Sequence, residues 1–137
     1  MIFVDTNVIS EILNIVPTRH VEAWLVRHDA ELALSSIVIA EVAFGIQKIR
    51  PDERAKRLEG GLQTLRRRFA GRIFPFTEEA ALIYGEVMGQ AARRGIQMSG
   101  SDGMIAAVAL VNGGRLATRN VKDFKDTGLT IINPWDM

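Results

Sequence analysis

Cysteine is absent from the 137-residue sequence, and histidine occurs only twice. Without cysteine the chain can form no disulfide and no thiolate metal site, and a reducing cytoplasm is its simplest setting. The two histidines, His20 and His28, do not have the spacing of about four residues that places two histidines on one helical zinc site. We expect them at the surface or in packing contacts. Oxygen atoms are therefore the ligands left for a metal ion.

Long apolar runs are also missing. The longest uncharged stretch, residues 103–114, is too short to cross a bilayer. The chain opens with Met1-Ile2-Phe3-Val4-Asp5, in which no basic stretch precedes an apolar segment, so a signal peptide is not indicated. No repeat, low-complexity tract or phosphate-binding glycine loop is present. We expect a cytoplasmic globular protein with no membrane association, and the length predicts a single domain over residues 1–137.

The net charge of +1 is unevenly distributed. Residues 48–72 hold nine basic and three acidic side chains, and three of the basic ones, Arg66, Arg67 and Arg68, are consecutive. A basic stripe of this kind suits a phosphate backbone, so these three arginines are candidate nucleic-acid-binding residues. The alternative interpretation is a solvated, arginine-rich helix surface.

Strand patterns alternate with helix patterns along the whole chain. The strands are expected near residues 2–4, 32–34, 73–76, 115–118 and 130–132, with helices between them. One helix is expected to start at Pro17, and Gly60-Gly61 predicts a break that divides the charged region into two helices. The alternation predicts an α/β fold, a three-layer α/β/α sandwich around a central, mainly parallel sheet.

Two aspartates occupy positions where ligands gather in such folds. Asp5 ends the first strand, and Asp102 opens a late apolar helix. In open parallel sheets the crevice beyond the carboxyl ends of the strands binds ligands. Each aspartate also has a plain structural explanation, because acids favour the first turn of a helix.

Glu41 stands alone inside the apolar run IVIAEVAFGI, residues 37–46. Its neighbours on the same helical face are mostly apolar, so the helix is expected to cross the core with apolar residues on all sides. A buried carboxylate needs a cation. That cation could be Lys48 or an arginine from elsewhere in the chain, in a structural ion pair, or it could be a bound metal. Gly45 leaves room on the same face.

These three acids favour one chemistry if they converge. Two carboxylates about 4 Å apart repel by about 4 kcal/mol at an effective dielectric near 20, so three of them need a counter-charge. Oxygen ligands alone select a hard dication such as Mg²⁺ or Mn²⁺. A dication of this kind activates water and stabilises phosphodiester charge. The sequence therefore indicates metal-dependent phosphodiester hydrolysis.

Four segments of the chain resemble one known family. They are MIFVDTNVISE, SSIVIAEVAFGI, SGSDGMIAAVAL, and LATRNVKDF followed by INPW. In this order and spacing they resemble PIN-domain ribonucleases, specifically the VapC toxins of bacterial toxin-antitoxin modules and their FitB-like relatives. The resemblance covers essentially the whole chain and implies a Mg²⁺-dependent endoribonuclease.

The resemblance also implies roles for individual residues. Asp5, Glu41 and Asp102 correspond to the family's catalytic acids, which together hold the metal. Thr6 and Asn7 correspond to residues that orient the first carboxylate.

Many family members carry a fourth acid where this chain has Asn120. The amide adds no charge, which favours a one-metal mechanism, although Asn120 remains a candidate catalytic residue. Asp123 could compensate for the missing charge, or it could be an ordinary surface acid. Thr118 is expected to position water or phosphate beside Asn120.

The resemblance further implies partners. They are a cognate antitoxin whose tail occupies the acidic pocket, an RNA substrate such as tRNA or rRNA, and a second copy of the chain in a homodimer. An alternative is a PIN module that binds nucleic acid or antitoxin with little nuclease activity. Receiver and dehalogenase-like phosphotransfer domains also place an Asp after the first strand, but the second early acid of the dehalogenases is Asn7 here.

Overall fold

Five parallel strands form the centre of the protein, for which a computed structural model describes all of residues 1–137. The strands are β1 (Ile2–Val4), β2 (Leu32–Ser35), β3 (Ile73–Phe74), β4 (Arg115–Ala117) and β5 (Ile131–Ile132). They are arranged in the order β3-β2-β1-β4-β5, and every neighbouring pair is parallel. The predicted sheet is confirmed, and it is parallel throughout.

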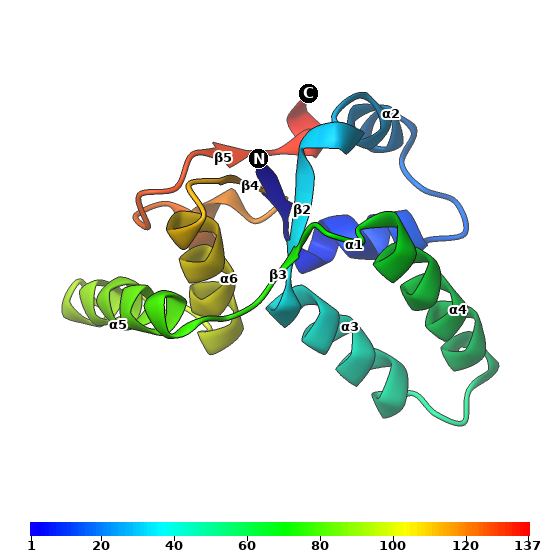
Figure 1. The fold of residues 1–137 in the computed structure, drawn as a ribbon, viewed down its shortest axis with the longest axis horizontal. Coiled ribbons are helices and arrows are strands. Elements are labelled where there is room, and N and C mark those ends of the chain that lie inside the picture. Colours follow the sequence, from blue (N-terminus) through cyan, green and yellow to red (C-terminus); the bar gives the residue numbers. More distant parts are fainter.

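Helices cover both faces of this sheet. They are α1 (Thr6–Leu13), α2 (Arg19–Arg27), α3 (Ser36–Lys48), α4 (Glu53–Arg68), α5 (Glu78–Arg93) and α6 (Gly100–Val111), with short 3-10 turns η1 (Asp29–Glu31), η2 (Val121–Phe124) and η3 (Pro134–Asp136). Figure 1 shows α5 and α6 on one side of the strands and α1, α2 and α4 on the other, with α3 leading away from the end of β2. The three-layer α/β/α sandwich is thus confirmed. None of these helices combines the length and the apolar character needed to span a bilayer.

The centre of the sheet and α6 carry the core. Every residue of β1 and β2 is buried, without the alternation of a half-exposed strand, as expected for a parallel sheet that is covered on both faces. The segment Ile105–Ala109 of α6 is also fully buried. Its alanines bring the helix close to the strands, and this packing fixes the start of α6 beside the end of β1.

The helix after Pro17 begins two residues later than predicted, at Arg19. The preceding residue, Thr18, is its N-cap, and the Thr18 amide donates a hydrogen bond to the Glu11 carboxylate of α1. Hydrogen bonding holds the pKa of Glu11 below its usual range. This contact between distant positions delays the helix, and no local pattern in the sequence indicates it.

The predicted break at Gly60-Gly61 is wrong, because α4 continues through both glycines. A Cβ atom at Gly61 would lie 2.8 Å from Cδ2 of Leu13, whereas a Cβ at Gly60 would meet nothing within 4 Å. Gly61 therefore lets α4 approach α1 closely. The glycine pair reflects helix packing and not a helix end.

The expectation that α3 is buried on all sides is also wrong. Only Val38 and Ile46 are buried, and Phe44 is 68% exposed. The helix leaves the end of β2 and covers the core with one face (Figure 1). Ile37, Ile39, Val42 and Ala43 are partly buried against the core, so Phe44 is the large apolar residue of α3 that stays available to a partner.

The two glycines of α4 provide a matched test of this packing. We expect Gly60→Ala to stabilise the protein by about 1 kcal/mol, because alanine is the better helix former and the site is open. At Gly61 the same gain should be cancelled or reversed by crowding of Leu13, which typically costs about 1–3 kcal/mol. Urea denaturation of both variants measures the difference. Equal stabilisation by the two substitutions would contradict the close approach of α1 and α4.

Candidate active site

The strand order places a crevice between the ends of β1 and β4. The chain moves from β1 outward to β2 and β3 and then returns past β1 to β4. Connections that depart in opposite directions leave such a crevice at the carboxyl ends of the two central strands. Asp5 follows β1 at this point, and its amide still pairs with Ala117 O of β4 at 2.9 Å.

Asp5 is a buried carboxylate held by neutral donors. Its side chain is only 4% exposed. One oxygen accepts a hydrogen bond from the Thr6 amide at 2.8 Å, and the other accepts from the Thr118 hydroxyl at 2.6 Å and the Asn7 amide at 3.2 Å. Burial raises the pKa of Asp5 above its usual value; these hydrogen bonds oppose the rise, and the charges of Glu41 and Asp123 add to it.

Thr6 connects two of the predicted site acids. While its amide binds Asp5, its hydroxyl donates to Oε1 of Glu41 at 2.5 Å. The sequence indicated Thr6 as a partner of the first carboxylate only. One residue at the start of α1 therefore orients both acids.

Asn7 and Thr118 form a hydrogen-bonded group around the Asp5 carboxylate. The Asn7 side chain also donates to the Thr118 hydroxyl at 3.3 Å and accepts from the Arg119 amide at 3.3 Å. Thr118 is fully buried and its hydroxyl points at Asp5. Its observed contact is thus with the carboxylate, and the expected role beside a water or a phosphate remains a prediction.

Asp102 enters the same region from the start of α6. Ser99 caps this helix by accepting the Asp102 amide at 3.1 Å. The pKa of Asp102 is raised to about 6, chiefly by burial and then by the charge of Asp5; a hydrogen bond with Ser99 opposes the rise, and the charges of Asp123 and Glu41 add to it. The three acids far apart in the sequence therefore share one electrostatic environment.

Asp123 is the acid that the sequence analysis left undecided. It lies on η2, is exposed, and raises the pKa of both Asp5 and Asp102 by its charge. Asn120 is exposed, and its amide donates to the Thr118 hydroxyl at 3.0 Å. The short helical turn after Asn120 thus brings a fourth negative charge, that of Asp123, to the crevice. In the sequence, the only indication of this role was that Asp123 lies three residues after Asn120.

No cation of the chain neutralises these acids. The five ion pairs of the structure join other residues, and Lys48 makes none with Glu41. The structural ion pair considered for Glu41 is therefore not formed. Its observed partner is the uncharged Thr6 hydroxyl.

The donor chemistry of the crevice fits a hard dication. Carboxylate and amide oxygens are the ligands that Mg²⁺ and Mn²⁺ prefer, and none of the three acids forms an ion pair within the chain. The side chains do not themselves form a closed ligand cluster, since no three Asp, Glu, His or Cys groups gather closely enough to hold an ion.

The three consecutive arginines at the end of α4 are not brought to these acids, although Arg54 and Arg57 at its start line the cavity that contains Glu41. Arg68 pairs with Asp29 at 2.7 Å, and Arg72 donates to Leu32 O at the start of β2. The end of α4 therefore lies at the opposite edge of the sheet from Asp5. Arg66 and Arg67 are exposed and donate to Gln63 and Thr64 of their own helix. Their role in nucleic-acid binding stays a prediction.

Asp102 should destabilise the protein in the absence of a dication. A carboxyl whose pKa rises from 3.8 to about 6 on folding contributes stability below about pH 4 that is lost as the pH rises through 6. We expect Asp102→Asn to be more stable than the parent in EDTA at neutral pH by about 1 kcal/mol, after discounting for partial exposure. The advantage should vanish near pH 4.

Urea denaturation across this pH range measures the effect. Glu22→Gln, at an exposed position of α2, is the matched control and should show no such pH dependence. A parent whose stability relative to Asp102→Asn does not change between pH 4 and 7 would contradict the shared electrostatic environment.

Comparisons with known proteins show the family to which the chain belongs. The model of the family described as "PIN domain" matches residues 2–128. The VapC ribonuclease Y4jK of Sinorhizobium fredii is 40% identical, with 99% of each chain covered, and Toxin FitB of Neisseria gonorrhoeae is 37% identical, with 98% of this chain and 99% of FitB covered.

Solved structures give the same result. The structure titled "Structure of FitAB bound to IR36 DNA fragment" matches with a TM-score of 0.90 and 36% identity, over 100% of this chain and 97% of the other. "Crystal Structure of FitAcB from Neisseria gonorrhoeae" matches with a TM-score of 0.89 and 35% identity over 100% of both chains. Since the family model matches residues 2–128 and the two relatives match the chain over nearly its full length, the chain belongs to the PIN-domain family, among the VapC ribonucleases and FitB toxins of toxin-antitoxin systems.

Proposed function

We propose that the protein is a Mg²⁺-dependent endoribonuclease that hydrolyses RNA phosphodiester bonds and acts as the toxin of a toxin-antitoxin module. The observation that carries this proposal is the group of carboxylates without cationic partners at the carboxyl edge of the sheet. Relatives named as VapC ribonucleases and a FitB toxin support it. All of residues 1–137 would act as one domain, in the cytoplasm where RNA is available.

Asp5, Glu41 and Asp102 would hold the ion, with Asn120 and Asp123 at its edge. The bound dication supplies charge to the scissile phosphate and lowers the pKa of water. The protein's own residues prepare the carboxylates for this task. Thr6 orients Asp5 and Glu41 together.

The proposed antitoxin partner has a groove available next to Glu41. A cavity of about 400 Å³ runs between α1, α3 and α4 and is lined by Thr6, Glu41 and Gly45, among others. A Cβ atom at Gly45 would meet nothing within 4 Å, so the glycine keeps the groove open beside the carboxylate. A cationic side chain of an antitoxin tail could reach Glu41 along it. Titles of solved relatives describe FitAB and VapBC assemblies bound to DNA.

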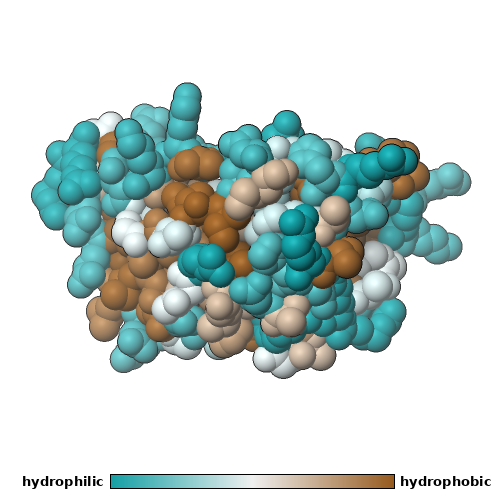
Figure 2. Space-filling model, turned by 90° about the horizontal axis from the view of Figure 1, so that it is seen from above, coloured by the Kyte–Doolittle hydropathy of each residue, from teal (hydrophilic) through white to brown (hydrophobic).

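A homodimer is the further assembly that we propose. Large apolar side chains remain exposed on helices, including Phe44 of α3 at 68% and Leu82 of α5 at 70%. Figure 2 shows hydrophobic residues gathered over the left half of one face of the molecule, where Figure 1 places α5 and α6. Apolar surface of this kind suits a protein partner.

The second candidate function is a binding module with little nuclease activity. Asn120 favours it, because the amide leaves that position without the charge of a fourth acid. A preparation free of antitoxin that binds Mn²⁺ without cutting any cellular RNA would support this alternative.

Loss of either buried aspartate should abolish activity. We expect Asp5→Asn and Asp102→Asn to lose RNA cleavage with added Mg²⁺ and to lose growth arrest on expression without antitoxin, because each removes a ligand charge from the site. Cleavage of total RNA and colony counts measure the two effects, and Glu22→Gln serves as the control. Variants as toxic as the parent would refute the metal-site assignment.

The hydrogen bond from the Thr6 hydroxyl to Glu41 should contribute to catalysis. Thr6→Val keeps the side-chain shape and the hydrogen bond from the backbone amide to the Asp5 carboxylate, but it removes the hydroxyl that donates to Glu41. We expect a fall in kcat/KM of about 10–100-fold, as is typical when a group that orients a metal ligand is lost. Thr6→Ser retains the hydroxyl and should keep most of the activity. If both variants lose activity equally, the hydrogen bond to Glu41 is not what matters.

A further inference from the structure

A second groove approaches the acids from the opposite side, between α5 and η2. A hollow of about 620 Å³ touches both Asp102 and Asp123, and it is lined by Met88, Ile96 and Met98. A deeper cavity of about 200 Å³ adjoins it and shares Ile96, Met98 and Asp123. The two form one path that leads from the catalytic acids toward the end of α5.

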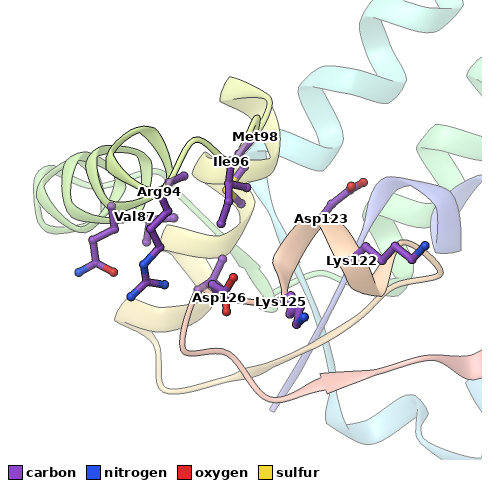
Figure 3. A pocket seen from close by; sticks show the side chains of 11 residues that line it. Val87, Arg94, Ile96, Met98, Lys122, Asp123, Lys125 and Asp126 are labelled. Carbon is purple, nitrogen blue, oxygen red and sulfur yellow. The ribbon is translucent and has the colours of Figure 1, made fainter.

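The walls of this path combine apolar and charged groups. Figure 3 shows Ile96 and Met98 between α5 and η2, with Arg94 extending from the α5 side and Lys125 and Asp126 from the segment after η2. Lys122 also lines the cavity, although its side chain extends away from α5. Arg94, Lys122 and Lys125 are exposed and make no ion pair.

We propose that this path holds the nucleotide adjacent to the scissile phosphate of a single-stranded RNA, a subsite that rests on the proposed ribonuclease function. Its base packs in the 200 Å³ cavity against Ile96 and Met98, and the phosphate beyond it meets Arg94 and Lys125. The cavity is smaller than the pockets of about 300–1,000 Å³ that enclose whole ligands, so it suits one base. Asp126 and Gln90 at the rim present hydrogen-bond acceptors for a base amino group.

Charge distinguishes RNA from the antitoxin as the occupant. Four acids in the crevice repel a polyanion, so a substrate needs cations on the far side of the cut. Arg94 and Lys125 line the cavity and make no ion pair, so they would repel a tail that carries a cation toward the acids. The other groove also contains two arginines, but Arg54 pairs with Asp52 and Arg57 donates to Leu13 O, and this groove reaches Glu41. The α5 side therefore favours the nucleic acid.

The first test removes two cations from the rim. Arg94→Ala/Lys125→Ala is compared with Arg19→Ala/Arg27→Ala, which removes two exposed charges from α2. In an Asp102→Asn background, anisotropy of a labelled single-stranded RNA reports binding. We expect the rim variant to bind at least about tenfold more weakly and its log K versus log salt slope to fall by about 1.4, the value for two lost phosphate contacts. The α2 control should match its background.

The second test addresses the base cavity. We expect Ile96→Glu to lower kcat/KM for RNA cleavage by about tenfold, because the base loses an apolar wall and meets a charge. Mn²⁺ affinity measured by calorimetry should be unchanged. Val26→Glu, an equally drastic change at an exposed apolar residue of α2, is the control. Replacing the nucleotide next to the cut by an abasic ribose, which keeps the scissile phosphodiester, should weaken cleavage by the parent but have no further effect on Ile96→Glu.

The outcomes separate the subsite from the ribonuclease proposal. If the parent cuts RNA and both groove variants cut and bind like their controls, the subsite is wrong while the function stands. If the groove variants keep full RNA activity but escape neutralisation by the cognate antitoxin, the path belongs to the antitoxin and the subsite is overturned. If the parent neither binds nor cuts RNA, both proposals fall together.

Discussion

Mutual repulsion of carboxylates at the carboxyl edge of the sheet is the constraint around which this protein is built. The fold brings Asp5, Glu41 and Asp102 into one environment, and η2 adds Asp123. A structural role for such acids would normally include an arginine or a lysine, because an unpaired buried charge is costly. No such cation is present, and the electrostatic cost remains in the raised pKa values of Asp5 and Asp102. A site that keeps this cost is arranged to receive positive charge from outside the chain.

Neutral donors allow the acids to be ordered without being neutralised. Thr6, Asn7 and Thr118 fix both oxygens of Asp5 through two hydroxyl or amide side chains and one backbone amide. A cation in the same place would have satisfied the carboxylate and competed with a metal. Hydroxyl and amide groups orient the oxygens and leave most of the charge available. This explains why a cluster of small polar residues surrounds the most buried acid of the crevice.

Local signals in the sequence predicted most of the fold, whereas contacts between distant elements decided the exceptions. The strands and the acid after β1 follow from patterns within a few residues. Gly61 is a packing contact with Leu13, which a local pattern cannot distinguish from a helix end. Likewise, Arg68 pairs with Asp29, which lies just before the start of β2 and hence at the other end of the strands from the acids. Only the three-dimensional arrangement of the strands reveals this separation. Whether Asp123 adds its charge to the site depends on the path of η2. Its spacing of three residues from Asn120 therefore suggested this role but could not establish it.

The two grooves that meet at the acids differ in chemistry, and this difference bears on how one site could serve two ligands of opposite charge. The groove between α1, α3 and α4 contains Glu41 beside Thr6, and its two arginines already have partners in Asp52 and Leu13 O, so Glu41 is the charge that a cationic side chain would meet there. The path along α5 begins at Asp102 and Asp123 and gains cations with distance from them. In the proposed function, an RNA strand and a cationic tail would approach the same acids along different surfaces and would exclude each other only at the acids. Because an inhibitor of this type needs to occupy only the acids, selection on the α5 surface can change the RNA that is cut without changing the contact that silences the enzyme.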